Sequence, residues 1–266
     1  MTHLKDLENN SIFIIREAYQ NFKDVALLWS IGKDSTTLLW LMRKAFFGKP
    51  PFPVVHIDTT YKFKEIYEFR DRYAREWDLN LIVARNESAL ERGLSPSTGK
   101  FECCNELKTN ALKNTLDEHK FKALYLAIRR DEHGIRAKER VFSPRDEDFK
   151  WDYMNQPAEL WGHYRSARED GEHLRIHPLL AWRELDIWEY IKEENIPIVS
   201  LYFAKNSKRY RSIGCECCCG SVESEADTLD GIIRELKNTN TSERSGRAQD
   251  KENAYTMAKL RALGYM

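Results

Sequence analysis

Short apolar runs alternate with segments of helical periodicity along most of this 266-residue chain. Parallel strands must be joined by crossovers, usually helices, so the alternation predicts an α/β fold with a parallel, doubly wound sheet flanked by helices. The apolar runs expected as strands are 24–29, 53–58, 80–84, 122–128 and 174–177. The segments expected as helices are 4–22, 36–47, 64–77, 106–119, 184–194 and 228–237.

Two stretches lack this pattern and set the expected domain organisation. Residues 141–172 are polar and aromatic without a clear period, which indicates a long functional loop or an insertion. From about Ser221 the chain becomes strongly charged. We therefore expect one domain over residues 1–220, with a charged C-terminal arm over residues 221–266 packed on it.

The charge and hydropathy of the chain exclude several classes of protein. It carries 42 basic and 42 acidic residues, and this balance argues against a protein that coats nucleic acid by bulk charge. A local basic groove is still compatible with it. Since no apolar run is long enough for a signal peptide or a membrane span, we expect a cytoplasmic protein without a membrane partner.

The six cysteines fall into only two places. Structural core thiols would be scattered, whereas clustered thiols can be metal ligands, sulfur carriers or a redox pair. In the cytoplasm, where thiols stay reduced, such clusters are typical of metal-binding or catalytic sites. The first place is the vicinal pair Cys103 and Cys104, and the second contains Cys215, Cys217, Cys218 and Cys219.

The segment SIGKDS, residues 30–35, lies between an expected strand and an expected helix. A glycine and small residues at such a turn let backbone N–H groups approach an anion, and the helix N-terminus adds positive potential. Lys33 can add a point charge and Ser35 a hydroxyl. The spacing differs from that of the longer phosphate loop, which ends in GKS or GKT. The hexapeptide favours a nucleotide site, and an ordinary capped turn is the alternative.

SIGKDS resembles the SGGKDS loop of the adenine-nucleotide alpha hydrolases, with Ile31 in place of the first loop glycine. The likeness extends along most of the chain. The similar segments are HIDTTYKFKEIYEFRDRYA (56–74), RRDEHGIRAKERVFSPRDE (129–147), WDYMNQPAELW (151–161), IHPLLAWRELDIWEYI (176–191) and TSERSGR (241–247). Along these segments the chain resembles the small subunit of sulfate adenylyltransferase. The family also includes the adenylyl-sulfate reductases and the ATP pyrophosphatases of DNA phosphorothioation.

This resemblance implies that residues 1–220 form an ATP pyrophosphatase domain, which cleaves ATP between its α and β phosphates. It suggests Asp58, at the end of the second strand, for the magnesium shell or a ribose contact, with Asp34 and Asp131 as weaker candidates. The residues expected to hold the ATP phosphates with magnesium are Ser30, Gly32, Lys33, Asp34 and Ser35.

Cleavage of ATP needs positive charge around the developing oxygens of pyrophosphate. On composition alone, the basic and acidic segment that follows the 122–128 strand fits a solvated, salt-bridged helix face equally well. The family resemblance favours a catalytic role for its cations and for Asp131. The cations are Arg129, Arg130 and Lys138, with Arg136 and Arg140 as further candidates.

The spacing of the cysteines resembles the pattern of the iron–sulfur adenylyl-sulfate reductases. Four thiolates are the usual ligands of a 4Fe-4S cluster, and zinc or bare sulfur-handling thiols are the alternatives. The extra thiols, Cys217 and Cys219, are candidates to carry persulfide. The residues that match the cluster pattern are Cys103, Cys104, Cys215 and Cys218.

No cysteine follows Cys219, whereas the reductases use one near the C-terminus, so this departure argues against reductase activity. Retained ATP chemistry with clustered thiols favours an ATP pyrophosphatase that adenylates a phosphate oxygen for sulfur incorporation. The resemblance alone suggests the DNA backbone as substrate. Expected partners are a cysteine desulfurase and DNA or DNA-acting proteins, and a homo-oligomer is compatible.

Two other functions are open at this point. The first is the small subunit of sulfate adenylyltransferase, which makes adenylyl sulfate from ATP and sulfate with a GTPase partner. The cysteines disfavour it, and the link at 200–216 is short where that subunit carries a longer insertion. The second is a non-catalytic adaptor that binds a nucleotide and docks a desulfurase.

Overall fold

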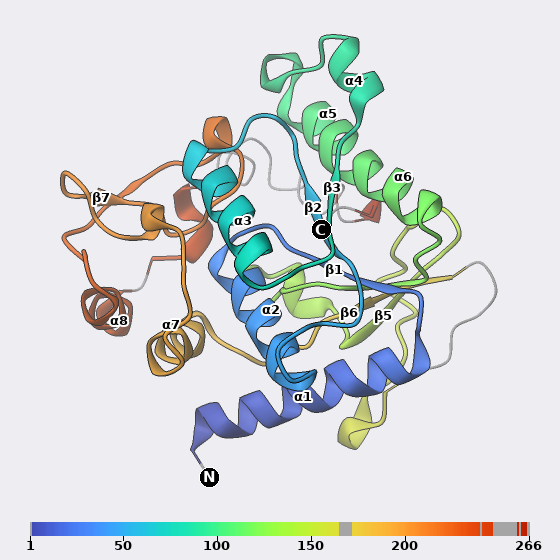
Figure 1. The fold of residues 1–266 in the computed structure, drawn as a ribbon, viewed down its shortest axis with the longest axis horizontal. Coiled ribbons are helices and arrows are strands. Elements are labelled where there is room, and N and C mark those ends of the chain that lie inside the picture. Colours follow the sequence, from blue (N-terminus) through green and yellow to red (C-terminus); the bar gives the residue numbers. More distant parts are fainter. Residues whose placement is uncertain (1, 165–171, 240, 247–259, 261, 265–266) are drawn as a thin grey trace.

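The computed structural model describes residues 2–164, 172–239, 241–246, 260 and 262–264. A single six-stranded sheet forms its centre, with the strand order β3-β2-β1-β4-β6-β5 (Figure 1). Neighbouring strands are parallel except for the β5–β6 pair. The strands are β1 (Val25–Leu28), β2 (Val54–Ile57), β3 (Leu81–Ala84), β4 (Ala123–Tyr125), β5 (Phe142–Arg145) and β6 (His173–Ile176).

Helices cover both faces of the sheet, which confirms the expected α/β, doubly wound architecture. The predicted helices are found within a few residues of their expected bounds. The α-helices are α1 (His3–Asn21), α2 (Lys33–Ala45), α3 (Lys64–Glu76), α4 (Glu87–Glu91), α5 (Lys100–Cys104), α6 (Ala111–Glu118), α7 (Glu184–Glu193) and α8 (Leu229–Asn238).

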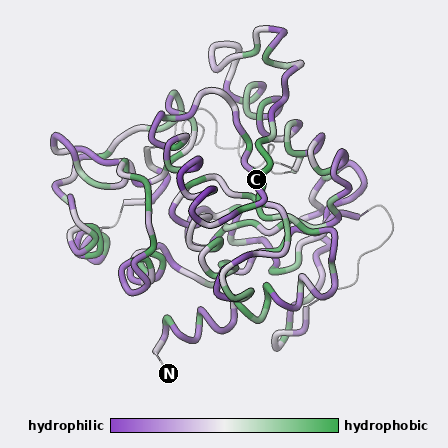
Figure 2. Tube along the Cα trace, viewed as in Figure 1, coloured by the Kyte–Doolittle hydropathy of each residue, from purple (hydrophilic) through white to green (hydrophobic). Residues whose placement is uncertain are grey.

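The side chains of β1 alternate between two apolar cores. Val25 and Leu27 pack into the larger core, which also contains the inner faces of α1, α2 and α7. Ala26 and Leu28 face the other side and pack against α6. Figure 2 shows the hydrophobic stretches gathered along the central strands, with hydrophilic stretches outside. A strand that is buried on both faces reads as a continuous apolar run, and this is why β1 is recognisable in the sequence.

The stretch 141–172, expected to be irregular, contains a strand. β5 pairs antiparallel with β6, with Phe142 opposite Ile176 and Arg145 opposite His173. The sheet is therefore mostly parallel, with one antiparallel strand at this edge. Pro144 lies within β5, and proline is tolerated in strands only at an edge such as this one. Residues 165–171 of the same stretch lie outside the described residues.

The expected helix 106–119 has a different form. It begins at α5, and a π-helical stretch, Asn105–Asn110, joins α5 to α6. A π-helical stretch inserts an extra residue per turn and is frequent at functional sites. Here it follows directly on the cysteine pair, which forms the end of α5.

The described part of the expected C-terminal arm includes α8, whose Ile232 and Ile233 belong to the larger core. A short antiparallel ribbon, β7 (Lys208–Arg209) with β8 (Val222–Glu223), precedes it. The domain boundary at residue 220 stays a prediction, and residues 247–259 lie outside the description. Among the described helices, none is both long and apolar enough to cross a membrane.

Candidate nucleotide site

A cleft opens at the carboxyl ends of β1, β2 and β4, where the strand order changes direction. In open parallel sheets this is the place where ligands bind. Its empty space is about 980 Å³ including the open mouth, within the range of small-molecule sites. Polar and charged residues of the cleft wall are Ser30, Lys33, Asp34, Ser35, Lys62, Lys108, Glu132, Arg136, Tyr202, Ser212, Glu243 and Arg244.

The loop between β1 and α2 holds a strained residue. Ile31 has a φ of 68° and is 1% exposed. Left-handed backbone is costly for any L-residue and a clear outlier for a β-branched one, so the fold imposes this conformation. Gly32 has an ordinary φ of −71° as the residue before α2. The left-handed conformation in this loop is therefore adopted by Ile31, at the position where the adenine-nucleotide alpha hydrolases have glycine.

The first turn of α2 presents small polar groups to the cleft. The hydroxyl of Ser35 lies 3.0 Å from that of Ser30 and donates to the carbonyl oxygen of Gly32 at 3.1 Å. The backbone N–H of Lys33 donates to the Tyr202 hydroxyl at 2.8 Å. Unsatisfied N–H groups and the helix dipole make such a terminus attractive to phosphate.

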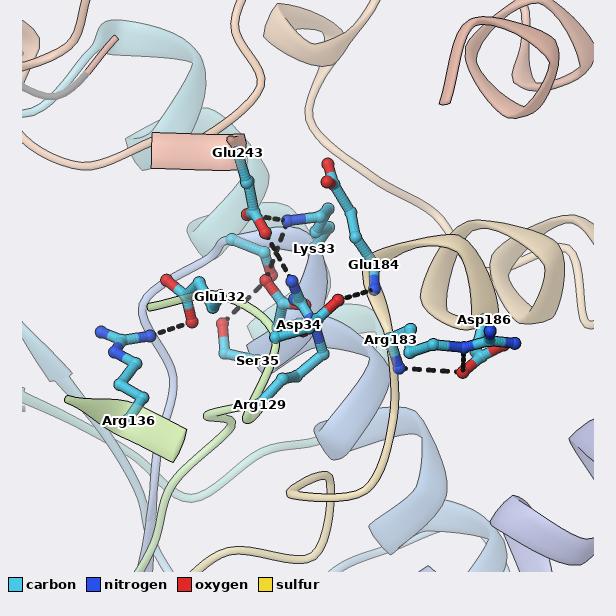
Figure 3. A network of polar contacts seen from close by, with 12 residues as sticks. Lys33, Asp34, Ser35, Arg129, Glu132, Arg136, Arg183, Glu184, Asp186 and Glu243 are labelled. Atoms are coloured by element: carbon cyan, nitrogen blue, oxygen red, sulfur yellow. Dashed lines mark hydrogen bonds and ion pairs between the residues drawn. The ribbon is translucent and has the colours of Figure 1, made fainter. Parts of the chain in front are cut away.

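A buried network of charges fills the floor of the cleft (Figure 3). The ammonium of Lys33 lies 3.1 Å from Asp34 Oδ2 and also contacts Glu243. The guanidinium of Arg129 contacts Asp34 and Glu243, and lies 2.9 Å from Asp131 Oδ1. Lys33 and Arg129 are both almost completely buried, so two cations and the carboxylates between them are held away from bulk water.

The electrostatics of this network favour the charged forms of Lys33 and Glu243, whereas burial raises the pKa of Asp34. Burial opposes the charged form of Lys33, but Asp34 and Glu243 outweigh it and raise its pKa. Burial likewise opposes ionisation of Glu243, but Arg129 and Lys33 lower its pKa below the ordinary value. The lowered pKa means that Glu243 is a carboxylate at neutral pH, with its charge balanced by the two cations.

A second pair of cations lies at one wall of the cleft. Glu132 contacts Arg136, and its Oε1 lies 3.2 Å from Arg244. Burial opposes ionisation of Glu132, but these arginines lower its pKa. The wall therefore carries positive charge that an anionic substrate can reach.

The structure divides the predicted cations into two groups. Lys33 and Arg136 line the cleft, and Arg129 supports it from behind through its contacts with the lining residues Asp34 and Glu243. Arg130 and Lys138 are exposed and lie outside its lining, and Arg140 donates to the carbonyl oxygen of Pro157 at 3.0 Å. The described geometry therefore favours the first group for phosphate contacts.

The predicted carboxylates also differ in position. Asp131 supports the network from outside, because it accepts from Arg129 and, at 2.7 Å, from the backbone N–H of Glu184. Asp58 lies at the end of β2, where it accepts from Tyr67 at 2.9 Å and contacts Arg85 at 2.6 Å. It is not part of the cleft lining, so its suggested role in magnesium or ribose binding stays a prediction.

The two cysteine segments meet beside the cleft. The backbone of Cys215 forms an isolated antiparallel β-bridge with that of Lys62, on the loop after β2. The sulfur of Cys215 lies 3.2 Å from the Thr59 hydroxyl. Burial, with Cys104 and Cys215 nearby, raises the pKa of the Cys103 thiol to about 12. The structure thus brings together thiols that are more than one hundred residues apart in the sequence.

Lys108 connects this thiol group with the nucleotide cleft. It is buried in the π-helical stretch after Cys104 and lines the cleft. Burial raises the pKa of the Cys218 thiol to about 12, and the charge of Lys108 opposes that shift. The thiols therefore lie within electrostatic reach of a residue that also faces the nucleotide site.

The predicted iron–sulfur cluster is not shown. Cys103, Cys104, Cys215 and Cys218 are buried, as cluster ligands would be. However, the described residues include no group of three or more His, Cys, Asp or Glu side chains arranged to hold a metal ion. Cys217 is exposed, while Cys219 accepts from the backbone N–H of Gly214 at 3.0 Å. The described thiols therefore lie near one another, but their positions do not form a set of ligands for iron or for zinc.

Comparison with a sequence model of the phosphoadenosine phosphosulfate reductase domain gives a match over residues 24–221. The chain belongs to this family. The match includes the strained loop, Arg129 and both cysteine segments. The family expectation drawn from SIGKDS is confirmed.

Curated relatives of this reductase-domain protein cover its whole length. Sulfate adenylyltransferase subunit 2 of Saccharophagus degradans is 45% identical over 296 aligned residues, which span 100% of this chain and 98% of the relative. Subunit 2 of Pseudomonas putida is 44% identical over 300 residues, again with 100% and 98% covered. The similarity to these relatives indicates that this chain is an enzyme that uses ATP for adenylyl transfer.

Solved structures confirm the fold of the family. Candida glabrata FMN adenylyltransferase in complex with ATP superposes with a TM-score of 0.58 at 18% identity, over 99% of this chain and 83% of that one. The phosphoadenylyl-sulfate reductase of Candida auris gives 0.52 at 17% identity, over 76% and 91%. At such identities the likeness concerns the fold alone.

Several cleft residues of this family member were not predicted from the sequence. Glu243 and Arg244 belong to TSERSGR, a segment that resembles the family, but nothing in its composition indicates which residues enter the cleft. Lys108 follows the cysteine pair by four positions, and this proximity was its only sequence signal. Tyr202 carried no signal, because its role depends on a contact with the backbone of Lys33.

Proposed function

We propose that this chain transfers the adenylyl group of ATP to sulfate and releases pyrophosphate. The observation that carries the proposal is the buried pair Lys33 and Arg129, placed at the N-terminus of α2 and at the edge where parallel sheets bind ligands. The identity of 45% over the full chain with a sulfate adenylyltransferase subunit supports sulfate as the acceptor.

In the proposed reaction an oxygen of sulfate attacks the α-phosphorus of ATP. A new phosphorus–oxygen bond forms, the bond to the oxygen that bridges the α and β phosphates breaks, and pyrophosphate leaves with that electron pair. Lys33 and Arg129 would stabilise the negative charge that develops on the leaving group. Preorganised cations in a site shielded from water are effective at this, because they need no rearrangement as charge develops.

Magnesium fits the residues of the cleft as a companion of the nucleotide. Mg²⁺ is usually held by one or two carboxylates together with substrate phosphates. Asp34 lines the cleft and its side chain is partly exposed, so it is the candidate protein ligand. When bound, the ion would neutralise phosphate charge.

The wall of the cleft offers cations for an anionic acceptor. Arg136, Arg244, Lys62 and Lys108 all line it in addition to the buried Lys33. Sulfate at neutral pH carries two negative charges and needs charge-assisted hydrogen bonds of the kind that these groups make. The relatives are named as subunit 2, and we propose that this chain also functions with another subunit.

The proposal is tested by incubating the chain, alone and with a candidate partner subunit, with MgATP in the presence and absence of sulfate. Pyrophosphate release that depends on sulfate supports it. Release that is equal without sulfate would contradict sulfate as the acceptor while leaving ATP cleavage in place. The reverse reaction, ATP formation from adenylyl sulfate and pyrophosphate, gives an independent reading.

A second function is favoured by the thiols beside the cleft. Adenylation of a phosphate oxygen followed by sulfur delivery, as in DNA phosphorothioation, would use the thiol group near Lys108. A cysteine desulfurase would be the proposed sulfur donor, and Cys217, which is exposed, is the proposed persulfide carrier. The relatives give no support to a DNA acceptor.

A DNA acceptor would need a basic contact surface, and the arginines of the basic run 205–211 are engaged inside the protein. Arg209 is buried against Glu235 at 2.5 Å, and Arg211 contacts Glu184 at 2.8 Å. Only Lys205 and Lys208 of this run are exposed cations. This run therefore offers only two exposed cations to a DNA backbone.

Metal and sulfur analysis separates the two functions. The protein, purified without oxygen, is assayed for iron, zinc, sulfide and persulfide, beside a Cys104→Ser variant. Bound iron and sulfide, or persulfide at Cys217, supports sulfur incorporation. A metal-free protein without persulfide that still shows sulfate-dependent pyrophosphate release would contradict it and support sulfate activation.

A further inference from the structure

The carboxylate of Glu243 occupies a place that suits a phosphate. It lies between the two buried cations, where it contacts the ammonium of Lys33 and the guanidinium of Arg129 (Figure 3). Glu243 is 7% exposed and comes from the segment 241–246, distant in sequence from both partners. The same two cations also contact Asp34 of α2, so Glu243 is the one of their two shared carboxylates that comes from a distant segment. Two buried cations held in this way form an anion site, and in this structure the chain supplies the anions itself.

The segment that carries Glu243 is held by polar contacts. Its sequence, TSERSG, contains no apolar side chain. Arg211 donates to the carbonyl oxygen of Thr241 at 2.7 Å, and Arg244 lies 3.2 Å from Glu132. Contacts of this kind can be exchanged for contacts with another anion, whereas a segment anchored in an apolar core would lose buried surface on moving.

Glu243 and a phosphate group compete for the same cations. Since Arg129 and Lys33 lower the pKa of Glu243, the carboxylate stays charged at neutral pH. A phosphate oxygen beside it would face like charge in a site shielded from water, where such repulsion is strong. Either the carboxylate moves away when the phosphate binds, or the phosphate binds elsewhere.

We infer that Glu243 is an exchangeable counter-ion of the pyrophosphate subsite. ATP displaces it from Lys33 and Arg129, and its return after the reaction displaces pyrophosphate. Glu243 thus acts as a positioning residue for product release, since it keeps the two cations in place while the subsite is empty. This inference rests on the proposed cleavage of ATP at this site.

The test is the affinity for pyrophosphate, measured by calorimetry without divalent metal, for the wild type and for Glu243→Gln. The variant keeps the size of the side chain and removes the competing charge. Exchanging a charge-assisted contact typically changes an affinity by about tenfold or more, so we expect Glu243→Gln to bind pyrophosphate at least that much more tightly. Glu243→Asp keeps the charge and should remain close to the wild type.

Glu235→Gln is the matched control. Glu235 also neutralises a buried arginine, Arg209, but lies outside the cleft. Its substitution should leave pyrophosphate affinity unchanged. Equal or weaker binding by Glu243→Gln would overturn the inference while the proposed function stands. Absence of binding by every variant would overturn the proposed nucleotide site as well.

Hydrogen exchange on the wild-type protein gives a reading that does not depend on a variant. If Glu243 leaves its cations, backbone amides of residues 241–246 should exchange faster when pyrophosphate is added. Slower exchange would show that the segment closes on the ligand and would contradict displacement. Loss of binding in Glu243→Gln only when magnesium is present would identify a metal ligand and would also contradict it.

Discussion

The ammonium of Lys33 lies against the carboxylate of Glu243, 210 residues further along the chain. Because Lys33 opens α2 directly after the β1 loop, this contact joins the C-terminal segment to the nucleotide site. Both residues line the cleft, so the contact forms part of its floor. It also means that the site is assembled from both ends of the sequence.

Removal of the Lys33 charge should abolish most of the activity. In Lys33→Ala the leaving pyrophosphate loses one of its two buried cations, and loss of one charge-stabilising group typically costs about 10²–10³-fold in rate. Pyrophosphate release under saturating ATP and sulfate measures the effect. Lys49→Ala, which removes an exposed lysine paired with Asp78, is the control and should retain full rate. A Lys33→Ala enzyme within about threefold of the wild type would contradict the assigned role.

Ile31→Gly should destabilise the protein although it relieves backbone strain. The left-handed conformation of Ile31 costs about 1–2 kcal/mol, which glycine would recover. The side chain is fully buried, however, and its loss costs about 2–5 kcal/mol, with a further 0.5–1 kcal/mol or so for the flexibility of glycine. We expect the free energy of unfolding to fall by about 0.5–5 kcal/mol, measured by urea denaturation. A gain in stability would mean that strain dominates over packing.

Tyr202→Phe should lower stability more without nucleotide than with it. The variant removes the acceptor of the Lys33 N–H, and an unsatisfied buried donor costs about 1–3 kcal/mol. A bound phosphate can accept from the same N–H group, so saturating ATP should reduce the difference in unfolding temperature. Tyr190→Phe, which loses a hydrogen bond to Glu8 away from the cleft, should show the same difference with and without ATP. Equal behaviour of the two variants would argue against a phosphate at this amide.

The imidazole of His56 should make stability fall as the pH decreases below 6.5. Its Nδ1 donates to the carbonyl oxygen of Trp29 at 2.9 Å, and burial lowers its pKa to about 3. Between these pH values the unfolded chain binds a proton that the folded chain does not, so the free energy of unfolding decreases by up to about 1.4 kcal/mol per pH unit from this group.

His56→Asn separates this effect from other titrating groups. From pH 6.5 to pH 5 the wild type should lose about 2 kcal/mol more than the variant, as measured by urea unfolding at both pH values. Parallel losses in the two proteins would mean that His56 accepts a proton in the folded state with an ordinary pKa.

Local sequence patterns were sufficient for the parallel strands and for the loop at residues 30–35. β1 and β2 are buried on both faces, so each reads as an unbroken apolar run, and α2 follows at helical periodicity. β5 could not be recognised in the same way. It is short, contains Pro144 and depends on pairing with β6, about thirty residues away.

The charge network of the site was predictable only in part. Lys33 and Arg129 lie in segments whose family resemblance indicated phosphate contacts. Glu243 depends on how the C-terminal segment crosses the cleft, which no local pattern encodes. The proximity of the two cysteine segments was expected from their resemblance to the reductase cluster pattern, but a ligand set depends on side-chain positions that the spacing alone does not determine.

The most direct test of adenylyl transfer to sulfate follows the sulfur atom of the acceptor into the product. The chain, with its partner subunit if required, is incubated with MgATP and sulfate labelled with a heavy sulfur isotope, and the products are analysed by mass spectrometry. We predict adenylyl sulfate that carries the heavy isotope, formed together with an equal amount of pyrophosphate and absent with Lys33→Ala. Pyrophosphate release without labelled adenylyl sulfate would contradict the claim and direct attention to a phosphate acceptor and to the thiols beside Lys108.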